Sequence, residues 1–508
     1  MADPLRLADP LALVTGAMAR EVAAAQGVCG RPLIRRVLDR DTGTDTQVAI
    51  PCGSTRERAC PSCAAKARRL RIQQCAEGWH RDTEPETPGD HDADDGDSDQ
   101  VDEDDCAGGE AESRRARSTR RRSDAPDLPR VPVEDRTVGR TYVSPEGREY
   151  RPSMFLTLTL PSYGAVRAGA PVDPGTYDYR RAALDAVVFP RLVDRFWQNL
   201  RRVAGYRVQY FAAVEPQHRL APHLHAAIRG TIPRQVIKQV VRATYVQVWW
   251  PSFETPVYVY RRPRWDGHDY CDPDTGQLLP TWQDALDQVD PDTPAHVARF
   301  GKQLDMAGIV APSVDADRAI RYLTKYLTKS IADAYTPTDD DTPADPRYAA
   351  HIDRLHAELQ YLPCGERCAN WLRYGIQPMD AGPGLIAGRC GGKAHDWDHL
   401  GLGGRRVLVS RQWSGKTLAE HRADRATVVR EALEAAGMLG PEIERMAATV
   451  LAKDGKPRFV WTDTRPDAAT YIRLVLAAVA EQRRWRTEYQ AAKEAAAAPV
   501  DNRSAAPP

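Results

Sequence analysis

No stretch of the 508-residue chain contains about 18 consecutive apolar residues, the length that a membrane-spanning helix requires. A cleavable secretory signal is also missing, so we expect a cytoplasmic protein. Charged residues make up 28% of the sequence, and the chain is longer than one ordinary domain. These features favour a soluble protein with several domains.

The chain also lacks an excess of charge and a phosphate-binding loop. The Gly-x4-Gly-Lys-Ser/Thr pattern that cradles nucleotide phosphates does not occur, which excludes a motor of that type within the chain. The 70 basic and 70 acidic residues balance, but residues 90–105 are densely acidic and residues 114–122 are rich in arginine. Such a composition buries little apolar surface, so we expect residues 81–150 to form a disordered charged linker.

The chain contains several cysteines. Because a secretory signal is missing, we interpret them as metal ligands and not as disulfide partners. In residues 1–80, a Cys-x2-Cys knuckle with two upstream thiolates predicts a tetrahedral, structural Zn²⁺ site. The predicted ligands are Cys29, Cys52, Cys60 and Cys63, with Cys75 as a possible substitute. Buried or free cysteines are the alternative interpretation.

A second cluster of cysteine and histidine lies in residues 336–400. Its spacing permits a second structural zinc site, because three thiolates and one imidazole fill a tetrahedral shell. The candidate ligands are Cys364, Cys368, Cys390 and His395, with His399 as the alternative histidine. Four protein ligands leave no open position for chemistry, so we expect this site to stabilise the fold.

A β-hairpin is predicted between residues 210 and 229. Residues 210–215 and 223–229 are rich in aliphatic and aromatic side chains, and the segment between them contains two prolines and polar groups. Side chains alternate between the faces of a strand, so His223 and His225 share one face while Leu224 turns toward a core.

The histidines and a nearby carboxylate form a candidate metal site. Glu215, at the end of the neighbouring strand, can complete a His-His-carboxylate set with open positions, which suits Mg²⁺ or Mn²⁺ acting on a phosphate oxygen. His218 in the hairpin loop is an alternative third ligand. Two histidines on a solvated strand face are the alternative to a metal site.

A tyrosine and lysine motif lies in a helical stretch predicted from about residue 316 to 334. At about 100° per residue, its tyrosines and lysines fall on one side of the helix, opposite the apolar residues. These side chains are Tyr322, Lys325, Tyr326 and Lys329. Tyrosine can attack a phosphodiester if a metal withdraws charge and a cation stabilises the phenolate, whose ordinary pKa is about 10. An amphipathic surface helix is the alternative.

Aromatic and basic residues alternate in one further region, which suits stacking on bases and contacts with phosphates of single-stranded DNA. The residues are Tyr245, Trp249, Trp250, Tyr258, Tyr260, Arg261, Arg262, Arg264 and Trp265. The alternative interpretation is that these aromatic side chains pack in a core.

Residues 401–508 are basic and mainly helical, with helices expected near 418–436 and 468–497. These helices either recognise double-stranded DNA or pack as a helical module.

Together these motifs resemble the HUH endonucleases, and within them the rolling-circle replication initiators of actinobacterial plasmids and integrative conjugative elements. Residues 154–160 look like the first motif of the superfamily, 222–225 like the second, and Tyr322 with Tyr326 like the two-tyrosine form of the third. The tyrosine pair is also similar to that of the gene A replication proteins of small single-stranded DNA phages.

The resemblance implies an α+β nuclease domain over residues 151–335, with a central antiparallel sheet and flanking helices. Residues 251–308 depart from the minimal domain and are expected to be an insertion. The expected architecture adds the N-terminal zinc-binding module and the helical C-terminal region.

The resemblance also implies a transesterification. One tyrosine attacks the phosphate at a nick site, forms a 5′-phosphotyrosine and leaves a 3′-OH, and the second tyrosine closes the cycle. Tyr322 and Tyr326 match the nucleophiles, and Lys325 and Lys329 match the basic positions. The metal ligands matched are His223, His225 and Glu215.

The implied partners are single-stranded DNA, double-stranded origin DNA, and a host helicase and polymerase. A conjugative relaxase or a tyrosine transposase would use the same chemistry. A zinc-dependent DNA-binding regulator without catalysis is a hypothesis of another class, and it predicts DNA affinity without covalent adducts.

Overall fold

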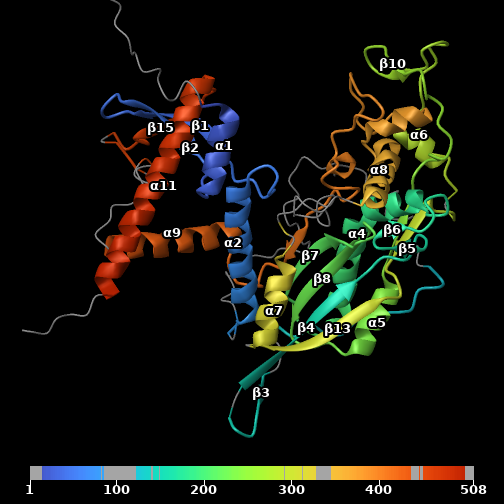
Figure 1. The fold of residues 1–508 in the computed structure, drawn as a ribbon. Coiled ribbons are helices and arrows are strands. Elements are labelled where there is room, and N and C mark those ends of the chain that lie inside the picture. The colour runs from blue at the N-terminus through green and yellow to red at the C-terminus, as the bar shows by residue number, and fades with distance from the viewer. Residues whose placement is uncertain are drawn as a thin grey trace, which may run out of the picture. The chain divides into compact units, whose positions relative to one another are not determined.

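The computed structural model describes residues 14–81, 83–84, 122–138, 141–147, 149–290, 292–311, 313–325, 327, 345–435, 446, 450–452 and 454–497. Within these residues the protein is a mixed α+β structure of helices and antiparallel sheets, as predicted (Figure 1). The chain divides into two compact units. We call residues 1–74 with 416–508 the terminal unit, and residues 75–415 the central unit.

The terminal unit contains a three-stranded antiparallel sheet in the order β15-β1-β2. Its strands are β1 (Leu33–Asp39), β2 (Asp45–Ile50) and β15 (Phe459–Asp463). Its helices are α1 (Gly16–Ala25), most of α2 (Pro61–Trp79), α9 (Leu418–Ala435) and α11 (Ala468–Ala497). Helix α1 packs on α11 through small and branched side chains, which are Ala19, Ala23, Val28, Val475 and Val479. The positions of α9 and α11 confirm the two helices predicted from the sequence.

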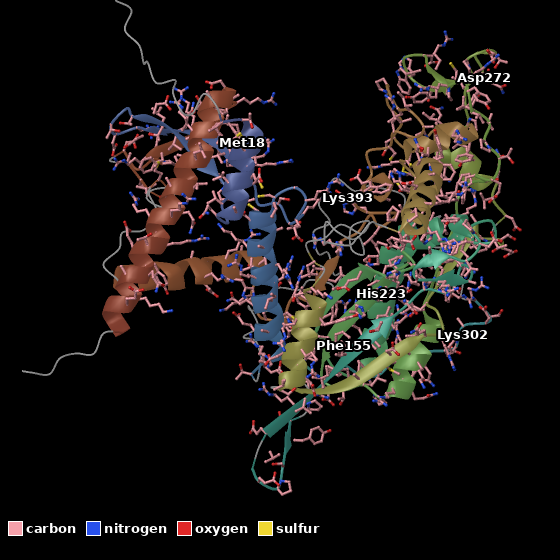
Figure 2. All side chains as sticks on the ribbon, viewed as in Figure 1. Met18, Phe155, His223, Asp272, Lys302 and Lys393 are labelled. Carbon is pink, nitrogen blue, oxygen red and sulfur yellow. The ribbon has the colours of Figure 1, made fainter. Side chains whose placement is uncertain are left out.

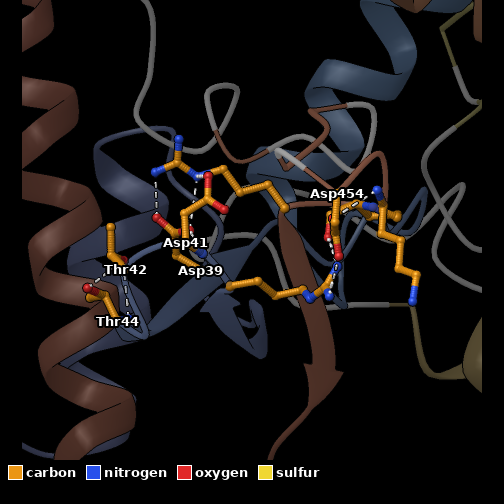
Figure 3. Close-up of polar contacts among 9 residues, drawn as sticks. Asp39, Asp41, Thr42, Thr44 and Asp454 are labelled. Carbon is orange, nitrogen blue, oxygen red and sulfur yellow. Dashed lines mark hydrogen bonds and ion pairs between the residues drawn. The ribbon is translucent and has the colours of Figure 1, made fainter.

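Ion pairs link β1 to the segment beside β15, which comes from the other end of the sequence (Figure 3). Arg458 donates hydrogen bonds to both carboxylate oxygens of Asp39, at 2.9 and 2.7 Å. The Arg458 guanidinium holds the pKa of Asp39 well below its usual value. Together with the pairing of β1 and β15, this contact explains why the predicted modules 1–80 and 401–508 contribute to a single unit.

The central unit is built on an antiparallel sheet in the order β13-β4-β8-β7-β14, with β3 paired to β4. The strands are β3 (Tyr142–Val143), β4 (Glu149–Leu158), β7 (Tyr210–Pro216), β8 (Pro222–Arg229), β13 (Leu304–Ala311) and β14 (Val407–Val409). Strands β7 and β8 form the predicted hairpin, and every residue of both strands is buried. Short pairs flank this sheet: β5 (Val166–Arg167) with β6 (Ala170–Pro171), β9 (Tyr245–Val248) with β12 (His296–Arg299), and β10 (Arg264–Trp265) with β11 (Tyr270–Cys271).

Helix α4 (Tyr179–Ala204) covers one face of the central sheet. Asp178 caps its first turn by accepting a 2.9 Å hydrogen bond from the Arg181 amide, and Gly205 ends it in the left-handed conformation. Its apolar side joins the main core with the inward residues of β4 and β8. The other helices of this unit are α5 (Arg234–Ala243), α6 (Trp282–Asp287), α7 (Val314–Leu323), α8 (Pro346–Tyr361), η3 (Ala369–Tyr374) and η4 (Lys393–His395).

Two predicted boundaries differ from the structure. Residues 304–308 fall inside the expected insertion at 251–308, yet they form the first part of β13, which pairs with β4 from Arg151 to Leu158. In the expected linker, residues 85–121 lie outside the described residues, while Thr137 and Val138 are held by the Glu84 carboxylate through hydrogen bonds of 2.6 to 2.9 Å. The central unit therefore extends N-terminally of residue 151.

Candidate functional site

The residues predicted as ligands of the catalytic metal lie on adjacent strands of the β7–β8 hairpin. Glu215 on β7 is paired with His223 on β8, and His225 follows on the same face. Leu224 and Ala226, which alternate with the histidines, belong to the core beneath α4. The three candidate ligands therefore occupy the sheet face that points away from α4; Figure 2 labels His223 on this sheet.

Ligand atoms of these three residues converge. One such atom from each of Glu215, His223 and His225 lies within 4.8 Å of the other two. The Nε2 atoms of the histidines are 2.6 Å apart, and His225 Nε2 is 4.0 Å from Glu215 Oε2. Glu215 Oε1 is buried and has no hydrogen-bond partner among the described residues. Two imidazole nitrogens and this carboxylate fit a divalent cation with coordination positions left open.

Two side chains of β4 hold the ring of His225. Thr157 is paired with His225 across the strands, and its Oγ1 lies 2.9 Å from His225 Nδ1. A hydrogen bond at Nδ1 leaves Nε2 as the nitrogen that faces Glu215 and His223. Phe155 stacks on the same ring at a centroid distance of 5.8 Å. Strand β4, which contains the predicted first motif, thus holds the ring of His225 in place.

Burial sets the protonation states of the cluster. It raises the pKa of Glu215 to about 7, although the positive charges of Arg406 and Lys325 act in the opposite direction. It lowers the pKa of His223 to about 4 and that of His225 to about 3. Both imidazoles are therefore neutral near pH 7, and each keeps a nitrogen lone pair that a cation can accept.

Helix α7 brings Tyr322 to this cluster. Ser313 caps the start of the helix, and its last turn places Tyr322 Oη 3.3 Å from His225 Nε2. The phenol ring packs edge-on against Phe155 and His225. Tyr322 is 45% exposed, whereas His225 is 4% exposed. The tyrosine therefore lies between the buried ligands and solvent.

Helix α7 is shorter than predicted. The periodicity indicates a helix from about 316 to 334, but α7 ends at Leu323 and is followed by a turn. Thr324 closes this end because its Oγ1 donates a hydrogen bond to the carbonyl of Ile320 at 2.8 Å. The side chain competes with continued main-chain bonding, an effect that hydrophobic periodicity does not reveal.

Of the remaining residues of the tyrosine and lysine motif, the structure describes Lys325. Lys325 is exposed, and its charge acts on Glu215. Tyr326 and Lys329, predicted as the second nucleophile and the second basic position, lie outside the described residues. His218, the alternative third ligand, packs against Tyr348 at a centroid distance of 5.3 Å and is not part of the metal-ligand group.

The N-terminal cysteines form a compact cluster in the terminal unit. The cluster consists of Cys29, Cys52, Cys60 and Cys63, whose four sulfur atoms all lie within 4.8 Å of one another. Cys60 and Cys63 stand at the start of α2, which presents both thiols to the two upstream cysteines. Cys75 lies twelve residues after Cys63 on the same helix, a separation of about 18 Å, so it cannot replace a ligand of this cluster. Four thiolates can hold a tetrahedral zinc ion.

The second cluster, in the central unit, contains Cys364, Cys368, Cys390 and His395. The sulfur atoms of Cys364 and Cys390 are 3.9 Å apart, and His395 Nε2 lies 3.5 Å from Cys368 Sγ. The other nitrogen, His395 Nδ1, bonds to the carbonyl of Leu359 at 2.8 Å, which orients Nε2 toward the thiols. The structure thus selects His395 over His399 for this cluster, and its four donors could also hold zinc.

A family model described as "Replication initiator protein, pSAM2" matches residues 16–482. The chain belongs to this family of replication initiators. No curated protein and no solved structure matches the chain. Membership supports a role in starting plasmid replication and hence in binding DNA. The matched residues include parts of both the terminal and the central units.

In this replication initiator, Arg406 is a site residue that sequence reasoning missed. Strand β14 pairs with β7, and Arg406 at its start donates through Nε to the carbonyl of Val214 at 3.3 Å. Burial lowers the pKa of Arg406, and the charge of Glu215 acts in the opposite direction. The residue lies in a basic segment, but only the pairing of distant strands brings it beside Glu215.

None of the helices that the structure describes is long and apolar enough to cross a membrane.

Proposed function

We propose that this replication initiator nicks and rejoins single-stranded DNA at an origin, and so starts rolling-circle replication of a plasmid or integrative element. The observation that carries the proposal is the position of Tyr322 Oη, 3.3 Å from a nitrogen of the Glu215, His223 and His225 cluster. The tyrosine that we propose as the nucleophile thus lies next to the residues that we propose as metal ligands. We place the reaction in the cytoplasm, where a host helicase would unwind the duplex and a host polymerase would extend the 3′-OH.

The step we propose is a transesterification at phosphorus. The Tyr322 oxygen attacks the scissile phosphate and loses its proton, the new bond is a 5′-phosphotyrosine, and the bond to the 3′ oxygen breaks. That oxygen takes a proton and becomes the 3′-OH that a polymerase extends. The step needs no other reactant, because one ester bond to phosphorus replaces another. Attack of a 3′-OH on the phosphotyrosine reverses the step and rejoins the strand. Tyr326 is proposed as the second nucleophile.

We assign three side chains to metal binding and the lysines to stabilising the phenolates. His223, His225 and Glu215 would hold Mg²⁺ or Mn²⁺, which when bound withdraws charge from a phosphate oxygen. Lys325 is proposed to stabilise the phenolate of Tyr322, because its charge already acts on the neighbouring Glu215. Lys329 is proposed for the same role beside Tyr326. The two cysteine clusters are proposed to bind structural Zn²⁺, since their four ligands leave no open position.

The nicking proposal is tested with full-length protein and labelled single-stranded oligonucleotides that cover the origin of its own element. Denaturing electrophoresis in Mn²⁺ should show a protease-sensitive covalent adduct that is absent in EDTA. His225→Ala should abolish the adduct, while His218→Ala, a histidine of the same hairpin outside the cluster, should retain it. If the wild-type protein binds this DNA but forms no adduct, the non-catalytic regulator becomes the better account.

A further inference from the structure

The aromatic and basic region predicted for DNA contact separates in the structure into a buried part and an exposed part. Trp250 is 8% exposed and belongs to the main core, and Tyr258 and Trp265 pack against a smaller core around Tyr270. Tyr260 is 99% exposed. We call residues 257–264, which carry Tyr260 and three arginines, the arginine loop.

The exposure of Tyr260 comes from a loop that is anchored at both ends. On one side, the amides of Val257 and Tyr258 both donate to the carbonyl of Arg373 at 2.9 Å. Tyr258 Oη also donates to Asp272 at 2.7 Å. On the other side, the loop runs into β10, which pairs with β11. The phenol ring is therefore held out from a fixed base, so less conformational freedom is lost when it binds a partner.

The charges of the arginine loop favour an anionic partner. Arg261 pairs with Asp274, but the described residues include no carboxylate paired with Arg262 or Arg264. Two nearby carboxylates accept hydrogen bonds within or beside their own turns. Asp266 accepts from the amides of His268 and Asp269, and Asp272 accepts from Tyr258, Asp274 and Thr275. Two guanidinium groups beside an exposed phenol ring thus remain available to phosphates.

The second cysteine and histidine cluster positions this loop. Arg373, whose carbonyl holds Val257 and Tyr258, lies on η3. That short helix starts directly after Cys368, a member of the cluster. A metal ion bound by the cluster would fix the start of η3 and, through Arg373, the base of the arginine loop.

We propose that the arginine loop is a second contact for single-stranded DNA, separate from the nicking site. A base stacks on the ring of Tyr260, and Arg262 and Arg264 contact the adjoining phosphates, the combination by which proteins bind single strands without sequence preference. The inference rests on the proposed function only in taking DNA as the ligand. It adds a contact outside the hairpin site and a role for the second cysteine and histidine cluster.

The test is fluorescence anisotropy of the full-length protein with a labelled oligothymidylate in buffer without added Mg²⁺ or Mn²⁺ and without chelator, so that the nicking site receives no ion while the cysteine clusters keep theirs. Tyr260→Ala should weaken binding about tenfold, and Tyr260→Phe should keep wild-type affinity because the stacking surface remains. Tyr142→Ala, which removes an exposed tyrosine from β3, is the matched control and should bind as wild type. The double variant Arg262→Gln/Arg264→Gln should make the slope of log K against log salt shallower by about 1.4, about 0.7 for each lost phosphate contact.

The outcomes separate this proposal from the nicking proposal. Weaker binding of Tyr260→Ala to the single strand, with nicking retained at saturating origin DNA, supports the arginine loop as a contact. Unchanged affinity of Tyr260→Ala overturns it. An equal loss on a blunt duplex of the same length also overturns it, because paired bases cannot stack on the ring. Failure of the wild type to form adducts would contradict the nicking proposal and leave the anisotropy result valid.

Discussion

Thr157 decides which nitrogen of His225 faces the candidate metal site. Its Oγ1 lies 2.9 Å from His225 Nδ1, so the ring presents Nε2 to Glu215 and His223. Without this contact the imidazole can rotate or bear its proton on the wrong nitrogen. The role of the first motif is therefore expected to include support of a ligand as well as formation of a strand.

We expect Thr157→Val to weaken Mn²⁺ binding at least tenfold, the usual cost of removing a hydrogen bond to a metal-ligating histidine, while the fold is kept because the volume is unchanged. Thr157→Ser should retain most of the affinity. Isothermal titration with Mn²⁺ measures both. Thr159→Val, which removes a hydrogen bond to Gln303 and touches no ligand, is the control. Equal affinities in all four proteins would show that Thr157 has no role in orienting the ring.

Glu215 should make metal binding depend on pH. Its pKa is raised to about 7, so below that value a metal ion must displace a proton from the carboxyl group. Mn²⁺ affinity should therefore fall about tenfold per pH unit as the pH drops from 7, and should level off above 7. The histidines are neutral throughout this range because their pKa values are about 4 and about 3. Glu215→Gln should bind more weakly and lose the slope; a slope that persists in this variant would exclude Glu215 as its source.

Among the elements, the hairpin was predictable and the end of α7 was not. Strands β7 and β8 follow from local alternation and from the prolines at residues 216 and 222, which bound the turn. The end of α7 depends on a buried threonine, Thr324, that bonds back to Ile320. Helical periodicity continues through this point of the sequence, so the pattern alone predicts a longer helix.

Non-local pairing explains what else the sequence could not reveal. Arg406 reaches Glu215 only because β14 pairs with β7, with 192 positions between Arg406 and its hydrogen-bond partner Val214. Asp39 and Arg458 are 419 positions apart and join one sheet. No local pattern indicates such partners. The candidate ligands Glu215, His223 and His225, in contrast, lie in one hairpin whose spacing is set by strand geometry.

The second cysteine cluster should control the arginine loop at a distance. Cys368→Ser should lose one zinc ion and loosen η3, so single-strand binding should fall to the level of Tyr260→Ala. The double variant Cys368→Ser/Tyr260→Ala should bind no more weakly than either single variant, because both changes remove the same contact. Anisotropy with oligothymidylate measures all three. Additive losses would mean that the cluster and the loop act independently.

For the whole molecule, the two clusters predict a metal content. Native mass spectrometry of protein purified without chelators should give two zinc ions per chain, one for each group of four ligands. Cys63→Ser should leave one zinc ion, whereas Cys75→Ser should leave two, because Cys75 belongs to neither cluster. A chain with no zinc, or equal content in both variants, would contradict the assignment of the N-terminal ligands.

Among the described residues, Tyr322 lies beside the ligand cluster, and its proposed role as the nucleophile is the central claim. Mass spectrometry of the covalent DNA adduct, trapped in Mn²⁺ with the Tyr326→Phe protein and digested with trypsin and nuclease, identifies the residue that carries the nucleotide. The account predicts a phosphotyrosine-linked nucleotide on Tyr322 and no adduct in Tyr322→Phe/Tyr326→Phe. A nucleotide on any other residue, or an adduct that survives in the double variant, would contradict it.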